Sequence, residues 1–495
     1  MPNTFPHEQV RSRPLQPRLY RSLHRARGDR VERLSVELHG KDPLVEQIVA
    51  GIRREIDERR LRPGGRLPSI RLFAETHKVS RFTVVEAYDR LVALGYLESR
   101  RGAGFYATPR KNGEAASAGT QARPRTADLV WLIRRLLTER EGMALAGGPW
   151  IPSEWLDEPG MRRALRALAR QQGILEWGDP RGYAPLRAQL ELALAELDIP
   201  AAASQIVLTD GTSQALDLVM RRLLRPGDTA LVDDPGYYNL FGNLRQHGVQ
   251  LAGVPRGHDG PDIEALERLA RERRPKVYFT QSVMHNPTGT ALSPHVAFRV
   301  LQIAERCDFA VVEDDVCCDL DLPGPRLATL DRLNRVIYVR SFSKTLAGSL
   351  RVGFIACRAG LAEELLDLKM LTSITSSHLA ERLVHAALVD GHYRKFVARL
   401  RERIRQARER AVLALERMGL ELFVEPKAGM FLWARFPHID DSLPLAEAGL
   451  RERVMLAPGA VFRPNLESSP WMRFNVAVCE DPRLQHFLGR ARGGV

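Results

Sequence analysis

The sequence lacks the long apolar runs and the paired cysteines that mark membrane proteins and disulfide-rich or zinc-binding domains. No apolar run reaches the roughly 18 residues of a transmembrane helix. The five cysteines are odd in number and show no Cys-x-x-Cys spacing, which favours reduced thiols over disulfides or a metal site. The polar start MPNTFPHEQVRSR has no apolar core of a secretory signal. We therefore expect a cytoplasmic protein with no membrane partner.

The positive charge is unevenly spread along the 495 residues. Residues 1–111 hold 23 Lys and Arg against 13 Asp and Glu, whereas the remaining 384 residues hold 50 against 47. A basic first part on a nearly neutral body favours a polyanion partner for the first part alone. A solvated basic surface would have the same charge.

Four segments follow one another along the chain. Residues 1–40 are rich in arginine and have no clear period, which predicts a mostly disordered extension. Residues 41–108 predict helices and a hairpin, and residues 109–127, rich in Ala, Gly, Pro and charge, predict a flexible linker. From 128 to 490, short apolar strands alternate with helices. This α/β pattern predicts a mostly parallel sheet with helices on both faces and a smaller α+β subdomain from about 370.

The segment 41–108 has the pattern of a winged helix-turn-helix. An apolar stripe from Leu44 to Ile56 predicts a first helix, which ends at RLRPGGRLPS. Ser69 and Ser80 are placed to cap a second and a third helix. The stretch YLESRRGAGFYA then predicts a hairpin. In such a domain the exposed start of the third helix reaches base edges in the major groove.

This segment closely resembles the GntR-type winged-helix domain of bacterial transcription regulators, through the pieces LRPGGRLPS, VSRFTV and LGYLESRRGAGFYA. The resemblance implies that the domain binds double-stranded DNA at an operator. Val85 stands where some members have a basic residue, so their base preference does not carry over. The DNA contacts that the resemblance implies are Ser69, Arg71, Ser80, Arg81, Thr83, Arg101 and Gly102.

In the second part, unusual residues follow the predicted strands. DGTSQAL follows QIVLT, PGYY follows TALVDD, QSVMHNPTG follows KVYFT, EDDVCC follows FAVV, and SFSK follows VIYVR. Each of these motifs alone indicates turn chemistry. Because ligands bind at the carboxyl ends of strands in doubly wound sheets, the set together predicts one ligand site.

Pyridoxal 5'-phosphate is a cofactor that requires all of these parts. Its aldehyde needs a lysine, and its phosphate needs hydroxyls, helix-start amides and an arginine. Its ring nitrogen needs a carboxylate, and its ring face needs an aromatic side chain. The motifs therefore predict a site for pyridoxal 5'-phosphate.

Residues 140–480 resemble the fold-type I aminotransferases of class I. The resemblance implies that Lys344 is the catalytic Schiff-base lysine and that Asp314 pairs with the ring nitrogen. It also implies that Tyr237 stacks on the ring and that Asn286 bonds the phenolic oxygen. Arg473 of WMRFNVAV would clamp an effector or substrate carboxylate. The implied phosphate contacts are Thr212, Ser213, Ser341, Ser343 and Arg351.

The order of winged helix, linker and aminotransferase-like domain resembles the MocR-type transcription regulators. That resemblance implies a homodimer that senses a small amino-acid or amine effector by aldimine exchange at Lys344. Two alternatives remain: an active aminotransferase with a fused DNA-binding head, and a DNA-binding protein whose large domain only dimerises. Retention of Lys344, Asp314, Asn286 and Arg351 argues against the second alternative.

Two departures from the aminotransferase pattern bear on catalysis. Val316 and Cys317 stand where the family usually has a tyrosine that bonds the cofactor's phenolic oxygen. Trp177 stands where a tyrosine usually reaches the phosphate of the partner subunit. We therefore expect transamination to be weak, although another hydroxyl such as that of Tyr238 would compensate if it lay close by.

Overall fold

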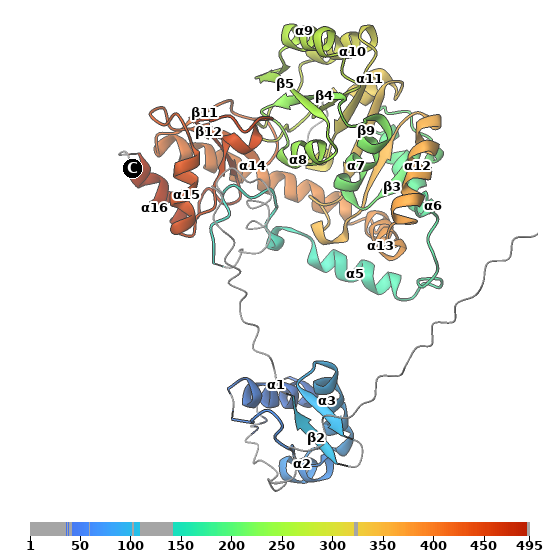
Figure 1. The fold of residues 1–495 in the computed structure, drawn as a ribbon, viewed down its shortest axis with the longest axis vertical. Coiled ribbons are helices and arrows are strands. Elements are labelled where there is room, and N and C mark those ends of the chain that lie inside the picture. Colours follow the sequence, from blue (N-terminus) through green and yellow to red (C-terminus); the bar gives the residue numbers. More distant parts are fainter. Residues whose placement is uncertain are drawn as a thin grey trace, which may run out of the picture. The chain divides into compact units, whose positions relative to one another are not determined.

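The computed structural model describes residues 36, 38, 42–58, 60–100, 103–108, 142–320 and 325–492. They belong to two compact units, Met1–Gln121 and Ala122–Val495, and each unit is described by itself (Figure 1). The predicted linker at 109–127 and most of the predicted extension at 1–40 lie outside the described residues. Among the described helices, none is long and apolar enough to cross a membrane.

The first unit is a winged helix-turn-helix, as the sequence predicts. Both predicted capping serines act as caps: Ser69 Oγ accepts from the Leu72 N–H, and Ser80 Oγ accepts from the Thr83 N–H. The hairpin strands pair antiparallel, with Leu97 opposite Ala107. The elements are α1 (Leu44–Asp57), α2 (Ile70–His77), α3 (Arg81–Ala93), β1 (Leu97–Arg100) and β2 (Gly104–Ala107).

A small core holds the first unit together. Ile48 and Ile52 of α1 pack against fully buried residues of α3, including Tyr88. The Tyr88 hydroxyl donates to the Pro68 carbonyl at 3.0 Å, so the buried phenol keeps a hydrogen-bond partner. Val36, which precedes the predicted start of the domain, is also buried in this core.

The second unit is built on an eight-stranded, mostly parallel sheet. The strand order is β3-β10-β9-β8-β7-β4-β5-β6, in which β10 runs antiparallel to both of its neighbours. All five predicted strands are present, and four of them pair in parallel. The strands are β3 (Ile206–Thr209), β4 (Thr229–Asp234), β5 (Gln250–Gly257), β6 (Gly260–Pro261), β7 (Val277–Thr280), β8 (Ala310–Asp314), β9 (Val336–Ser341) and β10 (Gly353–Ala356).

Helices cover both faces of this sheet, because successive strand residues point to opposite sides. Val311 of β8 packs into one core with α6 and α10, whereas Val312 packs into the other core with α7 and α12. Figure 1 shows these two layers. The helices before the C-terminal subdomain are α5 (Glu158–Leu168), α6 (Ala184–Ala195), α7 (Gly211–Leu223), α8 (Tyr238–Gln246), α9 (Ile263–Arg273), α10 (Pro294–Arg306), α11 (Leu327–Asp331), α12 (Ala359–Ser373) and α13 (His378–Val389).

The predicted C-terminal subdomain is an antiparallel four-stranded sheet packed on the long helix α14 (Tyr393–Arg417). Arginines of this helix are paired on its surface; Arg405, for example, contacts Glu402 and Glu409. This pairing agrees with a solvated helix face. The remaining elements are β11 (Glu421–Leu422), β12 (Phe431–Arg435), α15 (Leu443–Arg451), β13 (Ala457–Pro458), β14 (Trp471–Asn475) and α16 (Pro482–Ala491).

A buried ion pair joins three strands of the large sheet. Arg256 Nη1 of β5 donates to Asp233 Oδ2 of β4 at 2.9 Å, and the Tyr278 hydroxyl of β7 donates to Asp233 Oδ1. Burial by itself raises the pKa of Asp233, but Arg256, His285 and Tyr278 together lower it to about 2. The Asp233 carboxylate is therefore ionised and depends on its partners in the protein interior.

Arg256→Met is expected to cost the second unit about 3–5 kcal/mol of unfolding free energy, because it leaves the Asp233 charge buried without its cation. Arg221→Met is the matched control, since Arg221 pairs with Asp217 at 2.8 Å on the exposed surface of α7; its cost should stay below about 1 kcal/mol. All six tryptophans lie at position 131 or beyond. Tryptophan fluorescence during urea unfolding therefore follows this unit, and equal losses in the two variants would contradict the prediction.

Candidate functional site

A cavity of about 1350 Å³ lies at the carboxyl ends of the central strands of the second unit. Residues that follow β3, β4, β7, β8 and β9 in the chain line it, as the sequence predicts. The segment 143–154 and residues of β12 and β14 complete its wall. The predicted site residues that line the cavity are Thr212, Ser213, Tyr237, Asn286, Asp314, Ser343, Lys344 and Arg351.

One end of the cavity is suited to an anion. The amino end of α7 begins at Gly211, which has a φ of +78°. A Cβ atom at Gly211 would lie 2.5 Å from Arg351 Nη2, so only glycine lets this guanidinium approach the helix end. Arg351 Nη1 also lies 3.5 Å from Ser343 Oγ. A guanidinium, free helix-start N–H groups and hydroxyls thus meet where a phosphate dianion would be stabilised.

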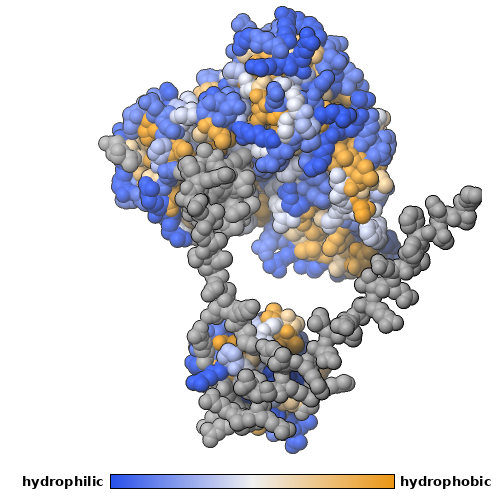
Figure 2. Space-filling model, viewed as in Figure 1, coloured by the Kyte–Doolittle hydropathy of each residue, from blue (hydrophilic) through white to orange (hydrophobic). Residues whose placement is uncertain are grey.

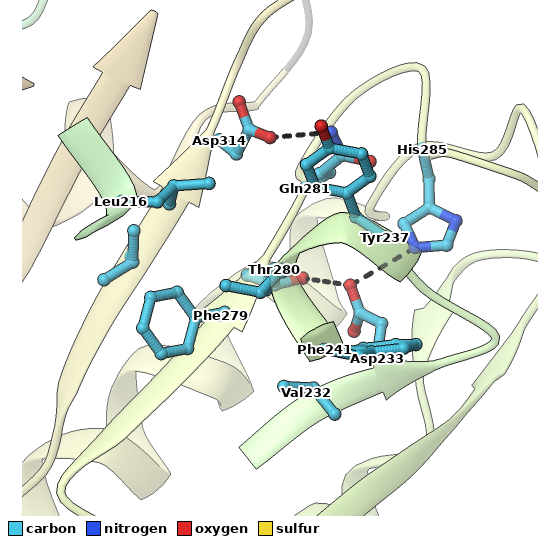
Figure 3. A pocket seen from close by; sticks show the side chains of 12 residues that line it. Leu216, Val232, Asp233, Tyr237, Phe241, Phe279, Thr280, Gln281, His285 and Asp314 are labelled. Carbon is cyan, nitrogen blue, oxygen red and sulfur yellow. Dashed lines mark hydrogen bonds and ion pairs between the residues drawn. The ribbon is translucent and has the colours of Figure 1, made fainter. Parts of the chain in front are cut away.

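Asp314, at the end of β8, brings a buried carboxylate to the cavity. Its Oδ1 is buried and has no hydrogen-bond partner among the described residues. Burial is the main cause that raises the pKa of Asp314 to about 7, and the neighbouring charge of Asp315 contributes to the same shift. Figure 3 shows the Tyr237 ring beside this carboxylate. A buried oxygen without a partner next to an aromatic ring fits the protonated ring nitrogen of pyridoxal phosphate.

Lys344 brings an amine to the same cavity. Its Nζ donates to the Pro149 carbonyl at 2.5 Å. Burial lowers the pKa of Lys344. Because the neutral amine is the nucleophile, this shift favours attack on a carbonyl carbon.

Arg473, predicted to clamp a carboxylate, is completely buried and does not line the cavity. Its Nη1 donates to Asn286 Oδ1 at 2.7 Å, and its Nη2 donates to the Gly147 carbonyl at 2.6 Å. Its guanidinium carbon lies 4.6 Å from the centre of the Phe431 ring. A ligand carboxylate would therefore have to take the place of the Gly147 carbonyl. Ser341 is likewise buried and stands outside the cavity wall.

Gln281 and Asn475 are among the polar cavity residues that the sequence predictions do not include. Gln281 lies directly after β7 and donates to Asp314. Its position at the carboxyl end of a strand is the sequence feature that indicates a site residue. Asn475 ends β14, and its Nδ2 donates to the carbonyls of Gly148 and Trp150. No local pattern announces Asn475, because the segment that it holds lies more than 300 residues earlier.

The two departures from the aminotransferase pattern lie in different places. Val316 and Cys317 line the cavity together with Lys344. Tyr238 also lines it, so one tyrosine hydroxyl is present beside the Arg473 guanidinium. Trp177 is 80% exposed on the surface of the unit.

In the first unit, Arg81 is the first residue of α3 and is exposed, as is its neighbour Phe82. Arg71 is also exposed and forms an ion pair with Glu75 at 2.9 Å. The Ser80 hydroxyl is bonded to Thr83, so helix capping occupies it. The predicted wing contacts Arg101 and Gly102 lie outside the described residues.

Comparison with known families assigns both units. Residues 157–490 match the family "Aminotransferase class I and II", and residues 44–107 match "Bacterial regulatory proteins, gntR family". These ranges agree with the fold of each unit. The aminotransferase domain implies pyridoxal phosphate as the cofactor.

Similar proteins include both enzymes and regulators. The chain is 33% identical to a 2-aminoadipate transaminase of Thermus thermophilus, over 73% of this chain and 94% of that protein. It is 30% identical to the probable rhizopine catabolism regulatory protein MocR of Rhizobium meliloti, over 84% and 86% of the two chains. It is 28% identical to the HTH-type transcriptional regulator YdfD of Bacillus subtilis, over 90% and 95%.

Among solved structures, α-aminoadipate aminotransferase LysN of Thermus thermophilus, crystallised with N-(5'-phosphopyridoxyl)-L-leucine, matches with a TM-score of 0.67 and 28% identity. The match covers 73% of this chain and 94% of LysN. LysN aligns with the large unit, whereas MocR and YdfD align with most of the chain. The chain therefore belongs to the class I and II aminotransferase family. Because it also carries a GntR-type head, it belongs to the MocR-like transcription regulators.

Proposed function

We propose that this chain is a transcription regulator that binds an operator through residues 41–108, holds pyridoxal phosphate at Lys344, and responds to a small amino-bearing effector. The observation that carries the proposal is the convergence of an amine, an anion site, a buried carboxylate and an aromatic ring on one cavity. When bound, the cofactor supplies an aldehyde that condenses with primary amines.

Different side chains of the cavity would hold different parts of the cofactor. The amino end of α7, Ser343 and Arg351 would hold the phosphate. Asp314 Oδ1 would accept from the ring nitrogen, and Tyr237 would lie against the ring. Lys344 Nζ would leave Pro149 to bond the cofactor, because its neutral form is favoured by burial.

An effector carboxylate would bind Arg473 in place of the Gly147 carbonyl. Lys344, Arg473 and Asn475 all bond carbonyls of the segment Gly147–Trp150. A ligand that takes Lys344 and Arg473 removes two of these bonds and loosens that segment. Because the segment begins 20 residues after the predicted linker, we propose that the linker responds to the effector through this loosening.

We also propose that two copies of the chain associate through the large domain. Figure 2 shows apolar surface gathered over the side of the second unit where α5 and α13 lie. Leu175 is 94% exposed, and Trp177 and Leu371 are similarly exposed. Contiguous apolar surface of this kind supports a protein partner, and a second copy gives the paired DNA heads that palindromic operators require.

Purified protein incubated with pyridoxal phosphate is expected to gain a visible absorption band that Lys344→Ala loses, because Lys344 is the only lysine among the described residues of the cavity wall. Lys395→Ala, on the exposed face of α14, is the control and should keep the band. An unchanged band in Lys344→Ala would contradict the assignment of the cofactor to Lys344.

Arg81→Ala is expected to weaken operator binding by about 1–3 kcal/mol and to leave binding to random DNA nearly unchanged, if Arg81 reads a base edge. Arg54→Ala, on α1, serves as the control for loss of one positive charge. Titration of the full chain with selected and random duplexes at one salt concentration measures both affinities. Equal losses on the two duplexes would show that Arg81 reads no sequence.

Transamination is expected to be slow, because Val316 and Cys317 bring no hydroxyl to the cavity where the family has a tyrosine, and the Tyr238 hydroxyl is engaged by Arg473. Keto-acid production should stay well below about 1 per second, and Cys317→Tyr should raise it. Cys307→Tyr, outside the cavity wall, is the control. Turnover at or above about 1 per second in the wild type would favour the alternative, an active aminotransferase with a DNA-binding head.

A further inference from the structure

The parallel register of β7 and β8 brings Gln281 next to Asp314. Thr280, the last residue of β7, lies opposite Glu313 of β8. The next residue of each strand is therefore a neighbour of the other at the carboxyl edge of the sheet. Gln281 is 6% exposed and lines the cavity together with Asp314. The two residues also line the smaller pocket drawn in Figure 3, where a dashed line marks the bond between them.

The chemistry of its partners fixes which way the Gln281 amide points. The backbone N–H of Asn286 lies 2.7 Å from one end of the amide, and a backbone N–H can only donate. That end is therefore the oxygen, Oε1. The opposite end is Nε2, which donates to Asp314 Oδ2 at 3.3 Å. A flipped amide would place two donors against each other.

The backbone of Gln281 is also fixed. Its carbonyl accepts from Arg256 Nη2 at 2.9 Å, and Arg256 is held by the buried Asp233 and by Thr290. The anchored backbone and the Asn286 N–H therefore limit how far the amide can follow Asp314 if that carboxylate moves. Beyond Gln281, the Asn286 side chain accepts from Arg473 Nη1 at 2.7 Å. One chain of hydrogen bonds thus runs from Asp314 through Gln281 and Asn286 to Arg473.

Several groups act on the charge of Asp314. Burial and the adjacent Asp315 favour its protonated form, whereas the backbone N–H of Val316, the charge of Lys344 and the Gln281 amide favour the carboxylate. The Tyr237 hydroxyl faces the same region and is neutral, since burial, its largest influence, raises its pKa well above the ordinary value. Gln281 and the Val316 N–H are uncharged donors, so both favour the carboxylate at every pH, and Gln281 is the one that a side-chain substitution removes. It occupies only Oδ2, and Oδ1 stays without a partner among the described residues.

We propose that Gln281 is a positioning residue that holds Asp314 as a carboxylate, leaves Oδ1 free for the ring nitrogen of the cofactor, and ties this carboxylate to the loop of Asn286. The proposal rests on the proposed function, because Asp314 matters in this way only when the cavity takes pyridoxal phosphate. Gln281 touches Asp314 and Asn286 and acts through them.

Two variants test the donor end and the acceptor end of the Gln281 amide separately. Gln281→Glu keeps an acceptor for the Asn286 N–H but removes the donor to Asp314 and adds a like charge. Gln281→Leu removes both bonds. Affinity for pyridoxal phosphate, measured by fluorescence titration between pH 6 and 9, is expected to fall about 10- to 100-fold at neutral pH in both variants, the range for a hydrogen bond to a charged group.

The pH profile gives a readout that a merely structural role would not move. A lost donor favours the protonated Asp314, so the pH below which cofactor affinity declines should rise in both variants. Asp314→Asn should bind weakly without this pH dependence. Gln406→Glu is the matched control: Gln406 Nε2 also donates to a carboxylate, Glu402 at 2.7 Å, but on the exposed face of α14. Its profile should match that of the wild type.

Folding is followed by circular dichroism in the same samples, so a variant that unfolds is recognised and the other one decides. Wild-type affinity and an unshifted profile in a folded Gln281 variant would overturn the proposal. A uniform loss of affinity at every pH would overturn it as well, because that result marks a structural role. A wild-type protein that binds no pyridoxal phosphate would overturn the proposed function itself, which distinguishes the two failures.

Discussion

The buried ion pair between Asp233 and Arg256 is the interaction on which the site depends. It crosses from β4 to β5, and Arg256 continues to the Gln281 carbonyl at the end of β7. A buried charge with fixed partners tolerates few positions, so the ends of these strands are held in one arrangement. The residues that follow β4 and β7, among them Tyr237 and Asn286, take their places from this arrangement. Neither Asp233 nor Arg256 lines the cavity, so the ion pair acts on the site through the strands that it joins.

Much of this fold and part of the site could be predicted from the sequence. The strands were visible as short apolar runs, and Lys344, Asp314 and Asn286 followed them directly. Because strand direction and order fix where carboxyl ends lie, their meeting in one cavity follows from topology. A position at the carboxyl end of a strand gives the location of a residue but not its hydrogen bonds.

The remaining features depend on contacts between distant segments. Arg473 was identified by its motif, but its burial under Gly147 depends on packing between β14 and a segment more than 300 residues away. Gln281 is absent from the sequence predictions, because only its register with Asp314 gives it a role. The charge of Asp314 likewise depends on burial, which no local pattern reports.

The claim at the centre of this account is that Lys344 is the amine that holds the cofactor. Borohydride reduction of the full chain with pyridoxal phosphate fixes the cofactor to the amine that it has bonded, and peptide mass spectrometry then locates it. The account predicts the added mass on the peptide that contains Lys344. Lys369 is the alternative site of labelling, because its Nζ is also buried and donates to the Pro180 carbonyl at 2.7 Å. Labelling of Lys369 instead of Lys344, or no labelled lysine at all, would contradict the account.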